Sequence, residues 1–232
     1  MLVLITGTRT GIGRALGEHL AKAGHTVLGC SRRPPQGDVK ESRHFCVDLT
    51  EHEQVKRMFR EIKMEYGHID GLINNAGSAL MNPFLLTPDS EIERIFRINV
   101  FAVFYCCREA VKLIRHSQYE SPSIINLSSI AVPWAIPGQS VYAASKGAIE
   151  QASRTLSREF AEMGIRVNTV ALPPVRTALT RTVDSSTIDA LIQRQAIKRM
   201  CTIDDLSGPI EFLLSPAAKF ITGSTLYLGG VA

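Results

Sequence analysis

The sequence predicts an α/β fold, with a doubly wound parallel β-sheet flanked by helices in a single domain over residues 1–232. Three observations predict it. Short runs rich in branched apolar residues alternate with longer segments of helical periodicity. A glycine-rich turn follows the first of these runs, and no repeat, low-complexity tract or linker divides the chain. Strands that alternate with helices pair in parallel through right-handed crossovers, so ligands are expected at the carboxyl ends of the strands.

The order of the elements follows from the same patterns. Leu2 to Thr6 is an apolar run stopped by Gly7, which is typical of a buried strand, and the helical spacing after the turn ends at Gly24. Such patterns predict strands at 2–6, 26–30, 45–47, 69–73, 124–127, 166–171 and 226–228, and helices at 12–22, 49–66, 89–116, 141–163, 186–197 and 203–214. Between the second and third strands only residues 31–43 intervene, too few for a full helix.

Composition excludes several classes of protein. Lys and Arg number 26 against 22 Asp and Glu, a net charge of +4, and 45% of residues are hydrophobic, which disfavours disorder and nucleic-acid binding. The five cysteines form no CxxC pair and the six histidines no HExxH, so neither disulfides nor a metal site is expected. No apolar run reaches the ~18 residues of a membrane span. The N-terminus does not resemble a signal peptide, so a cytoplasmic location without membrane partners is expected.

The glycine-rich turn predicts a dinucleotide site. Gly7 permits a tight turn, Gly11 lets the backbone approach a pyrophosphate, and Gly13 lets helix and strand pack closely. The helix that follows offers free N–H groups to an anion. The candidate cofactor residues of this turn are Gly7, Thr8, Arg9, Gly11, Ile12 and Gly13.

The end of the second strand indicates which dinucleotide is bound. An NAD site would place Asp or Glu there, whereas this chain has Ser31, Arg32 and Arg33. Guanidinium groups suit a phosphate, and Arg9 in the glycine-rich turn could reach the same phosphate. The alternative is a set of solvated surface charges. We expect NADP(H) rather than NAD(H).

Ser129, Tyr142 and Lys146 are the candidate catalytic residues. Tyr142 and Lys146 lie one helical turn apart, and the fifth strand runs into Ser128 and Ser129. A free tyrosine has a pKa of about 10, and a neighbouring ammonium should lower this pKa by favouring the phenolate. Ser129 can hydrogen-bond a carbonyl oxygen, to which Tyr142 can give a proton as hydride arrives at carbon. Ser128 should point to the opposite side of the strand.

In combination, these motifs resemble the short-chain dehydrogenase/reductase family. The resemblance rests on TGxxxGIG from Thr6, NNAG from Asn74, Asn99, the 13 residues from Ser129 to Tyr142, and YxxxK. It runs from Leu2 to Gly230. The family has a Rossmann-type sheet, and its members form homodimers or homotetramers.

The resemblance implies a role for each matching residue. Tyr142 would be the acid/base, Lys146 would bind the nicotinamide ribose, Ser129 would orient the substrate oxygen, and Asn99 would hold a water in a proton relay. The remaining cofactor contacts would come from Asp48 and Leu49 at the adenine and from Asn75, Ala76, Gly77, Pro173, Val175 and Thr177. The family usually has Pro-Gly where Leu172-Pro173 stands. In the family this segment passes over the nicotinamide. Pro173 has no N–H to donate there, so we expect this contact to differ from the usual one.

Three segments should line the substrate: residues 78–81, residues 130–139, and a lid over about 173–200. The middle segment is apolar, with Trp134 and one polar residue, Gln139, so the substrate residues would be Trp134 and Gln139 with Ser129 and Tyr142. Alternatively, Trp134 packs on the lid. Basic lid residues form either a solvated face or a docking site for an acidic carrier protein.

The predicted activity is therefore NADPH-dependent reduction of a ketone to a secondary alcohol. The substrate would be a β-ketoacyl compound or a hydrophobic cyclic or polyketide-like ketone. One alternative is oxidation of a secondary alcohol such as a sterol-like compound. Another is a cofactor-binding regulatory protein without turnover. No metal is expected.

Overall fold

A computed structural model describes residues 1–35, 37, 41–176 and 185–230 of the chain. Its strands form one parallel sheet in the order β3-β2-β1-β4-β5-β6-β7, which confirms the predicted doubly wound fold. The strands are β1 Leu2–Thr6, β2 Thr26–Ser31, β3 Arg43–Cys46, β4 Gly71–Asn74, β5 Ser123–Ser129, β6 Arg166–Leu172 and β7 Thr225–Tyr227. The order reverses between β1 and β4, so the strand ends there flank a crevice.

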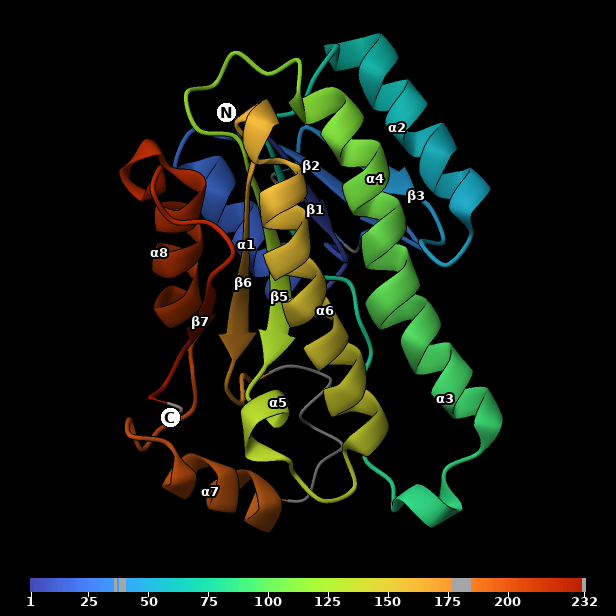
Figure 1. Cartoon of the computed structure of the whole chain (residues 1–232), viewed down its shortest axis with the longest axis vertical. Helices are drawn as coiled ribbons and strands as arrows, with labels where there is room; N and C mark the ends of the chain where they lie inside the picture. Colours follow the sequence, from blue (N-terminus) through green and yellow to red (C-terminus); the bar gives the residue numbers. More distant parts are fainter. Residues whose placement is uncertain (36, 38–40, 177–184, 231–232) are drawn as a thin grey trace.

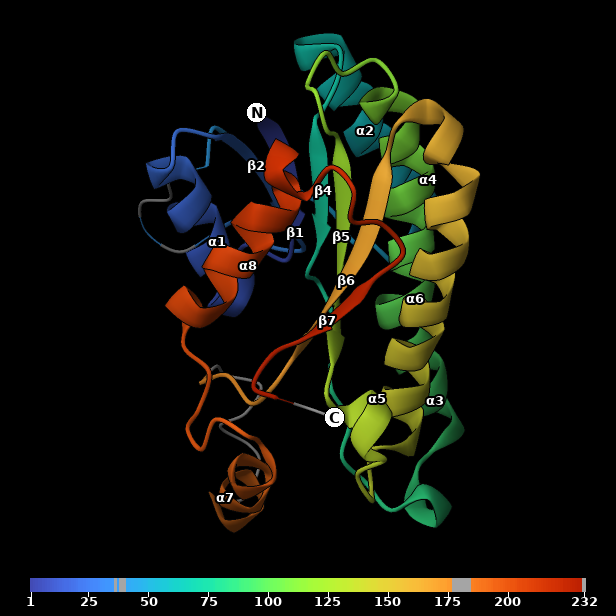
Figure 2. The ribbon, with the colours of Figure 1, turned by 60° about the vertical axis from the view of Figure 1, so that its left-hand side comes forward.

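Helices cover both faces of the sheet. The α-helices are α1 Gly11–Lys22, α2 His52–Tyr66, α3 Asp89–Phe96, α4 Ala102–Ile114, α5 Ala131–Trp134, α6 Ser140–Glu159, α7 Ser185–Arg194 and α8 Ile203–Leu214. Short 3₁₀ turns lie at η1 Phe84–Leu86, η3 Ala161–Met163 and η4 Pro216–Ala218, and a π-helical turn at η2 Arg97–Phe101. Figure 2 shows α1 and α8 on one face and α2, α4 and α6 on the other. In Figure 1, α5 and α7 lie beyond the carboxyl ends of β5 and β6.

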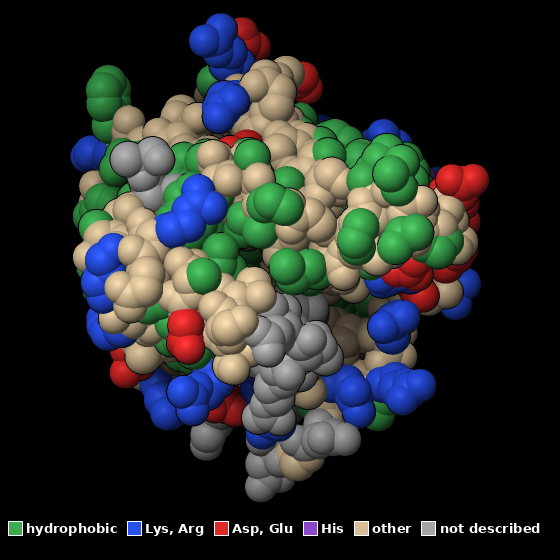
Figure 3. Space-filling model, turned by 90° about the horizontal axis from the view of Figure 1, so that it is seen from below, with side chains coloured by type: hydrophobic (Ala, Val, Ile, Leu, Met, Phe, Trp, Pro, Cys, Tyr) green, Lys and Arg blue, Asp and Glu red, His purple; other side chains and the backbone are tan. Residues whose placement is uncertain are grey.

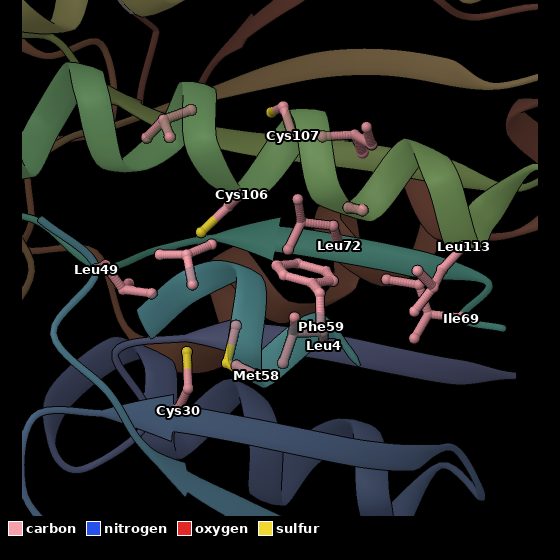
Figure 4. Packing of buried hydrophobic residues seen from close by; sticks show 14 of the residues in the cluster. Leu4, Cys30, Leu49, Met58, Phe59, Ile69, Leu72, Cys106, Cys107 and Leu113 are labelled. Atoms are coloured by element: carbon pink, nitrogen blue, oxygen red, sulfur yellow. The ribbon is translucent and has the colours of Figure 1, made fainter. Parts of the chain in front are cut away.

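Successive side chains of the buried strands point to opposite faces of the sheet and so form two apolar cores. Leu4 packs with Phe59 and Leu72 on the α2 and α4 side, whereas Val3 and Ile5 pack on the α1 and α8 side. Figure 4 shows the sulfur-bearing side chains of Cys30, Met58 and Cys106 beside this cluster. Burial raises the pKa of the Cys30 thiol to about 12, which keeps it protonated and inert. Among the described helices, none has the length and apolarity needed to cross a membrane.

Most predicted elements are present, with shifted ends. The pattern over 89–116 is confirmed as one helical run, but a π turn at Arg97–Phe101 interrupts its α-helical hydrogen bonding between α3 and α4. Such a turn adds one residue to a helical cycle, which hydrophobic spacing over a few turns does not reveal. The short α5 and η1 were also not predicted. The described part of residues 32–42 contains no helix, as the spacing indicated.

Glycines decide how closely α1 approaches the sheet. A Cβ atom on Gly13 would lie 2.4 Å from Asn75 Nδ2 and 2.5 Å from the carbonyl oxygen of Gly7. A Cβ atom on Gly17, one turn later, would lie 3.7 Å from Val27 Cγ1, an ordinary van der Waals contact. Close approach therefore requires glycine at position 13 and not at position 17.

This difference predicts opposite effects of one substitution at two positions of the same helix. We expect Gly13→Ala to lower the free energy of unfolding by about 1–3 kcal/mol, because the added methyl group overlaps backbone and side-chain atoms. We expect Gly17→Ala to raise it by about 0.5–1 kcal/mol, because alanine favours the helix and has room. Urea unfolding measures both, and changes of the same sign would contradict this packing.

Candidate active site

A cavity of about 1100 Å³ opens along the carboxyl ends of the strands. It runs from the glycine-rich turn after β1, past the ends of β4 and β5, to α7. Figure 3 looks onto this end, where hydrophobic side chains gather across the middle and most Lys and Arg side chains stand toward the rim. The position agrees with the crevice expected where the strand order reverses.

Most of the predicted cofactor residues meet in this cavity. Those that line it are Gly7, Arg9, Gly11, Ile12, Ser31, Arg32, Arg33, Asp48, Leu49, Asn75, Ala76, Gly77, Tyr142, Lys146, Pro173 and Val175. Thr8 and Gly13 are buried behind the turn and do not line it. Thr177 lies outside the described residues.

The glycine-rich turn is held in place by polar contacts to its neighbours. Its Gly7 N–H donates to the Cys30 carbonyl at 2.8 Å, and Asn75 Nδ2 donates to the Thr6 carbonyl at 2.8 Å. Gly7 and Gly11 adopt φ values of 77° and 64°, which glycine reaches without strain. The Thr10 side chain makes no capping hydrogen bond to α1, so the first N–H groups of this helix remain available to an anion.

The end of β2 forms a basic corner of the cavity. Arg32 and Arg33 are exposed there, and Arg9 joins them from the glycine-rich turn, where its Nε donates to the Pro34 carbonyl at 3.3 Å. Asp48 lies beyond, with its carboxylate accepting hydrogen bonds from the N–H and hydroxyl of Thr50. The corner thus presents guanidinium groups beside a cavity that a dinucleotide would fit.

Ser129, Tyr142 and Lys146 come together at the end of β5 and the start of α6. Lys146 Nζ donates to the Leu127 carbonyl at 2.8 Å and lies 6.0 Å from the centroid of the Tyr142 ring. Burial lowers the pKa of Lys146 from 10.5 to about 8. Burial also raises the pKa of Tyr142, and a hydrogen bond with Ser129 acts in the opposite direction.

The pKa of Tyr142 is shifted in the direction opposite to the one expected from the sequence. A lysine ammonium was expected to lower the pKa of Tyr142, but in this structure desolvation outweighs every favourable interaction. Tyr142 is therefore protonated at neutral pH. That is the state required of a group that gives a proton to a carbonyl oxygen.

Asn99 is buried on the π turn between α3 and α4. Its Oδ1 accepts a hydrogen bond from the Ser78 N–H at 2.9 Å, and its Nδ2 donates to the Ser78 carbonyl at 2.9 Å and to Ser145 Oγ at 3.0 Å. The side chain thus ties the segment after Gly77 to α6. A role for Asn99 in holding a relay water stays a prediction.

Trp134 and Gln139 were both predicted to contact the substrate, but only Gln139 lines the cavity. It does so together with Ile130, Ile136, Leu172, Ile188 and Leu191. Trp134 does not line it. It is 9% exposed, packs against Leu191, and stacks under the Arg194 guanidinium at 4.6 Å. The structure thus matches the alternative in which Trp134 packs on the lid.

Sequence reasoning missed a polar wall on α3. Arg94 lines the cavity, donates to Ser78 Oγ at 2.9 Å, and pairs with Glu91. In the sequence, Glu91 and Arg94 look like an ordinary pair on a helix surface, so no local signal marked them. Ser128 donates to Glu150 Oε1 at 2.7 Å, on the side expected from strand alternation.

The basic lid residues are largely engaged within the chain. Arg199 pairs with Asp205 at 2.7 Å, Lys198 donates to the Gln193 carbonyl, and Arg194 covers Trp134. Arg176 is exposed, and Arg181 lies outside the described residues. These contacts favour a structural role for much of the basic charge.

A doubly wound sheet with a glycine-rich turn and a Ser–Tyr–Lys cluster in one crevice defines a nicotinamide-dependent oxidoreductase. Residues 7–230 match the family model described as enoyl-(acyl carrier protein) reductase. The chain belongs to the short-chain dehydrogenase/reductase family. The 3-oxoacyl-(acyl-carrier-protein) reductase of Staphylococcus epidermidis is 30% identical over 237 residues, which cover 98% of this chain and 96% of that protein. The enzyme of the same name from Haemophilus influenzae is 28% identical over 235 residues (99% and 96%).

Solved structures agree with this assignment. The ligand-free aldohexose dehydrogenase of Thermoplasma acidophilum superposes with a TM-score of 0.90 at 30% identity, covering 99% of this chain and 93% of that one. A 4-hydroxyisoleucine dehydrogenase complexed with NADH superposes with a TM-score of 0.88 at 26% identity, covering 100% and 98%. The likeness therefore extends over nearly all of each chain.

The buried ammonium of Lys146 predicts a pH-dependent stability effect. Lowering the pKa from 10.5 to about 8 costs about 3 kcal/mol, and the hydrogen bond to Leu127 returns about 1 kcal/mol. We expect Lys146→Met to raise the free energy of unfolding by about 2 kcal/mol at pH 7. Below about pH 8 Lys146 is charged in both the folded and the unfolded protein, so burial of its charge costs the full amount of unfolding free energy. Between about pH 8 and 10.5 Lys146 is neutral in the folded protein and charged in the unfolded protein, so this cost decreases as the pH rises.

Urea unfolding of both proteins at pH 7 and pH 9.5 measures this effect. The exposed Lys63→Met on α2 is the control, with an expected change within about 0.5 kcal/mol at either pH. A Lys146→Met protein that is no more stable than the wild type at pH 7 would show that this ammonium is not penalised by burial.

Proposed function

We propose that the chain reduces a ketone to a secondary alcohol with NADPH, and that Tyr142 is the general acid. The observation that carries the proposal is the meeting, in one cavity, of the Ser129–Tyr142–Lys146 cluster with the basic corner at Arg9, Arg32 and Arg33. When bound, the nicotinamide nucleotide supplies the hydride.

The residues present fit such a nucleotide. Glycines at the turn bring the backbone to the cavity wall, and the uncapped start of α1 suits a pyrophosphate. Gly77 leaves the wall open beside Lys146, whose Nζ would lie 3.5 Å from a Cβ atom at that position. Pro173 lines the same cavity, and the Pro174 carbonyl accepts a hydrogen bond from Cys201 N at 3.0 Å. The chain after β6 is therefore anchored without the glycine usual in the family.

Ser129, Tyr142 and Lys146 would each have a different role in the reduction. Ser129 holds the carbonyl oxygen, and Tyr142 gives that oxygen its proton as negative charge develops on it. Burial keeps Tyr142 protonated until then. Lys146 carries a positive charge below about pH 8 and so favours the phenolate that remains.

A preference for NADP(H) is supported by the corner at the end of β2. Guanidinium groups bind the additional phosphate of NADP(H) through charge-assisted hydrogen bonds. A carboxylate at the end of β2, which would accept from the ribose hydroxyls of NAD(H), is replaced by Ser31.

The substrate we propose is a ketone on a hydrophobic skeleton or a β-ketoacyl chain bound to a carrier protein. The apolar wall of Ile130, Ile136, Ile188 and Leu191 supports it, as do relatives named as 3-oxoacyl-(acyl-carrier-protein) reductases. A second candidate is oxidation of a secondary alcohol, which the structural neighbours named as dehydrogenases favour. It uses the same groups in reverse.

We also propose a cytoplasmic homodimer or homotetramer. The phenylalanine side chains of Phe101 and Phe104, at the junction of η2 and α4, are 46% and 37% exposed. Apolar side chains of this size on a helix face are what a second copy of the chain would cover.

Removing the Tyr142 hydroxyl tests the mechanism. We expect Tyr142→Phe to lower kcat for ketone reduction by about 10²–10⁴-fold, because the developing alkoxide loses its proton donor. NADPH binding should change little. Loss of NADPH absorbance against a panel of ketones measures turnover, with Tyr119→Phe, outside the cavity, as the control. Undiminished turnover by Tyr142→Phe would remove Tyr142 from the mechanism, and NADPH binding by the wild type without turnover of any ketone or alcohol would favour a non-catalytic role.

Reversing the charge at Arg32 tests the cofactor preference. We expect Arg32→Asp to lower the ratio of kcat/KM with NADPH to kcat/KM with NADH by about 100-fold, because it removes a cation and adds repulsion toward the phosphate. The exposed Arg57→Asp on α2 should leave this ratio unchanged. The same ratio in Arg32→Asp as in the wild type would place the phosphate elsewhere.

A further inference from the structure

A buried imidazole and carboxyl lie directly behind the basic corner. His44 on β3 pairs in register with Gly29 of β2, so its side chain points to the same face of the sheet as Ser31. The side chains of His44 and Glu41 are 9% and 4% exposed. Neither residue lines the cavity, and neither belongs to a motif of the site described above.

The contacts of Ser31 determine which atoms donate. Ser31 Oγ has one proton and donates it to the Arg33 carbonyl at 2.6 Å. His44 Nε2, 2.8 Å from the same oxygen, must therefore donate to it. On the other side of the ring, Nδ1 lies 2.6 Å from Glu41 Oε2, within hydrogen-bonding distance. The ring is thus held at both nitrogens.

The strand leaves space for the carboxyl group. A Cβ atom on Gly29 would lie 2.2 Å from the Glu41 carboxyl, so a larger residue at that position would expel it. No helix occupies the described part of residues 32–42, and Glu41 instead covers the strand. Thr8 Oγ1 lies 3.4 Å from His44 Nδ1, which links the pair to the glycine-rich turn.

The pair reaches the basic corner through Ser31, whose Oγ lies 2.8 Å from His44 Nε2. Arg43 does not contribute there, since it lies on the opposite face and pairs with Glu61 and Glu65. The pair therefore acts on the corner through Ser31 and the turn that follows it.

We propose that His44, oriented by Glu41, is a positioning residue for cofactor selectivity: it fixes Ser31 and the Ser31–Arg33 turn so that the corner accepts the 2′-phosphate of the adenosine ribose. This inference rests on the proposed use of NADP(H). It assigns the selectivity to a buried pair as well as to the exposed arginines.

Binding of two fragments to the full chain tests it without catalysis. Calorimetry with adenosine 2′,5′-bisphosphate and with adenosine 5′-monophosphate measures the phosphate preference directly. We expect His44→Phe to weaken binding of the bisphosphate by about tenfold, the effect of one lost buried hydrogen bond, and binding of the monophosphate by less than about twofold. His44→Gln retains a donor toward Ser31 and should keep most of the preference.

Two further variants separate positioning from stability. Phe45→Leu, the next residue on β3 and buried on the opposite face, destabilises the strand but should change both affinities equally. Glu41→Gln, which weakens the hold on the ring, should lower the preference by about threefold even if His44→Phe fails to fold. Equal losses for both fragments in His44→Phe and an unchanged preference in Glu41→Gln would overturn the inference while leaving the proposed function intact. A wild type without preference for the bisphosphate would overturn both.

Discussion

A series of hydrogen bonds and short backbone segments joins the end of β1, where the glycine-rich turn begins, to helix α6, and the arrangement of the site depends on it. Thr6 Oγ1 accepts the N–H groups of Asn75 and Ala76, which locks the end of β1 to the end of β4. Two residues on, Ser78 is held by Asn99, and Asn99 holds Ser145, whose hydroxyl donates to the Tyr142 carbonyl. The glycine-rich turn and Tyr142 are therefore parts of one framework, although they lie in different halves of the chain.

Stability and chemistry oppose each other at the centre of this framework. The sheet is stabilised by two apolar cores, one against α2 and α4 and the other against α1 and α8. Lys146 of α6 lies against the end of β5, where its ammonium donates to the Leu127 carbonyl, and burial disfavours its charged form. Tyr142 is affected in the complementary direction, because burial favours its neutral phenol. The same desolvation thus keeps the Tyr142 phenol protonated and makes the neighbouring Lys146 ammonium easier to deprotonate.

Much of the fold and the meeting of Ser129, Tyr142 and Lys146 could be predicted because they depend on local patterns. Apolar strands ended by glycine, and Tyr142 and Lys146 one turn apart, are visible in a few residues of sequence. What escaped prediction depends on distant contacts. The π turn at Asn99 is a single inserted residue, Trp134 turns to α7 because Arg194 and Leu191 are there, and Glu41 meets His44 only because Gly29 leaves space. The raised pKa of Tyr142 likewise arises from burial, which spacing does not reveal.

The contact between Trp134 and α7 has a practical consequence. The chain contains a single tryptophan, and its ring lies between the short helix α5 and the Arg194 guanidinium. Indole emission responds to a neighbouring cation and to exposure to water, so the intrinsic fluorescence of this protein reports from one place, the seam where α7 closes over the cavity. The molecule therefore has a built-in optical probe of that seam, one that needs no label and senses α7 without lying in the cavity itself.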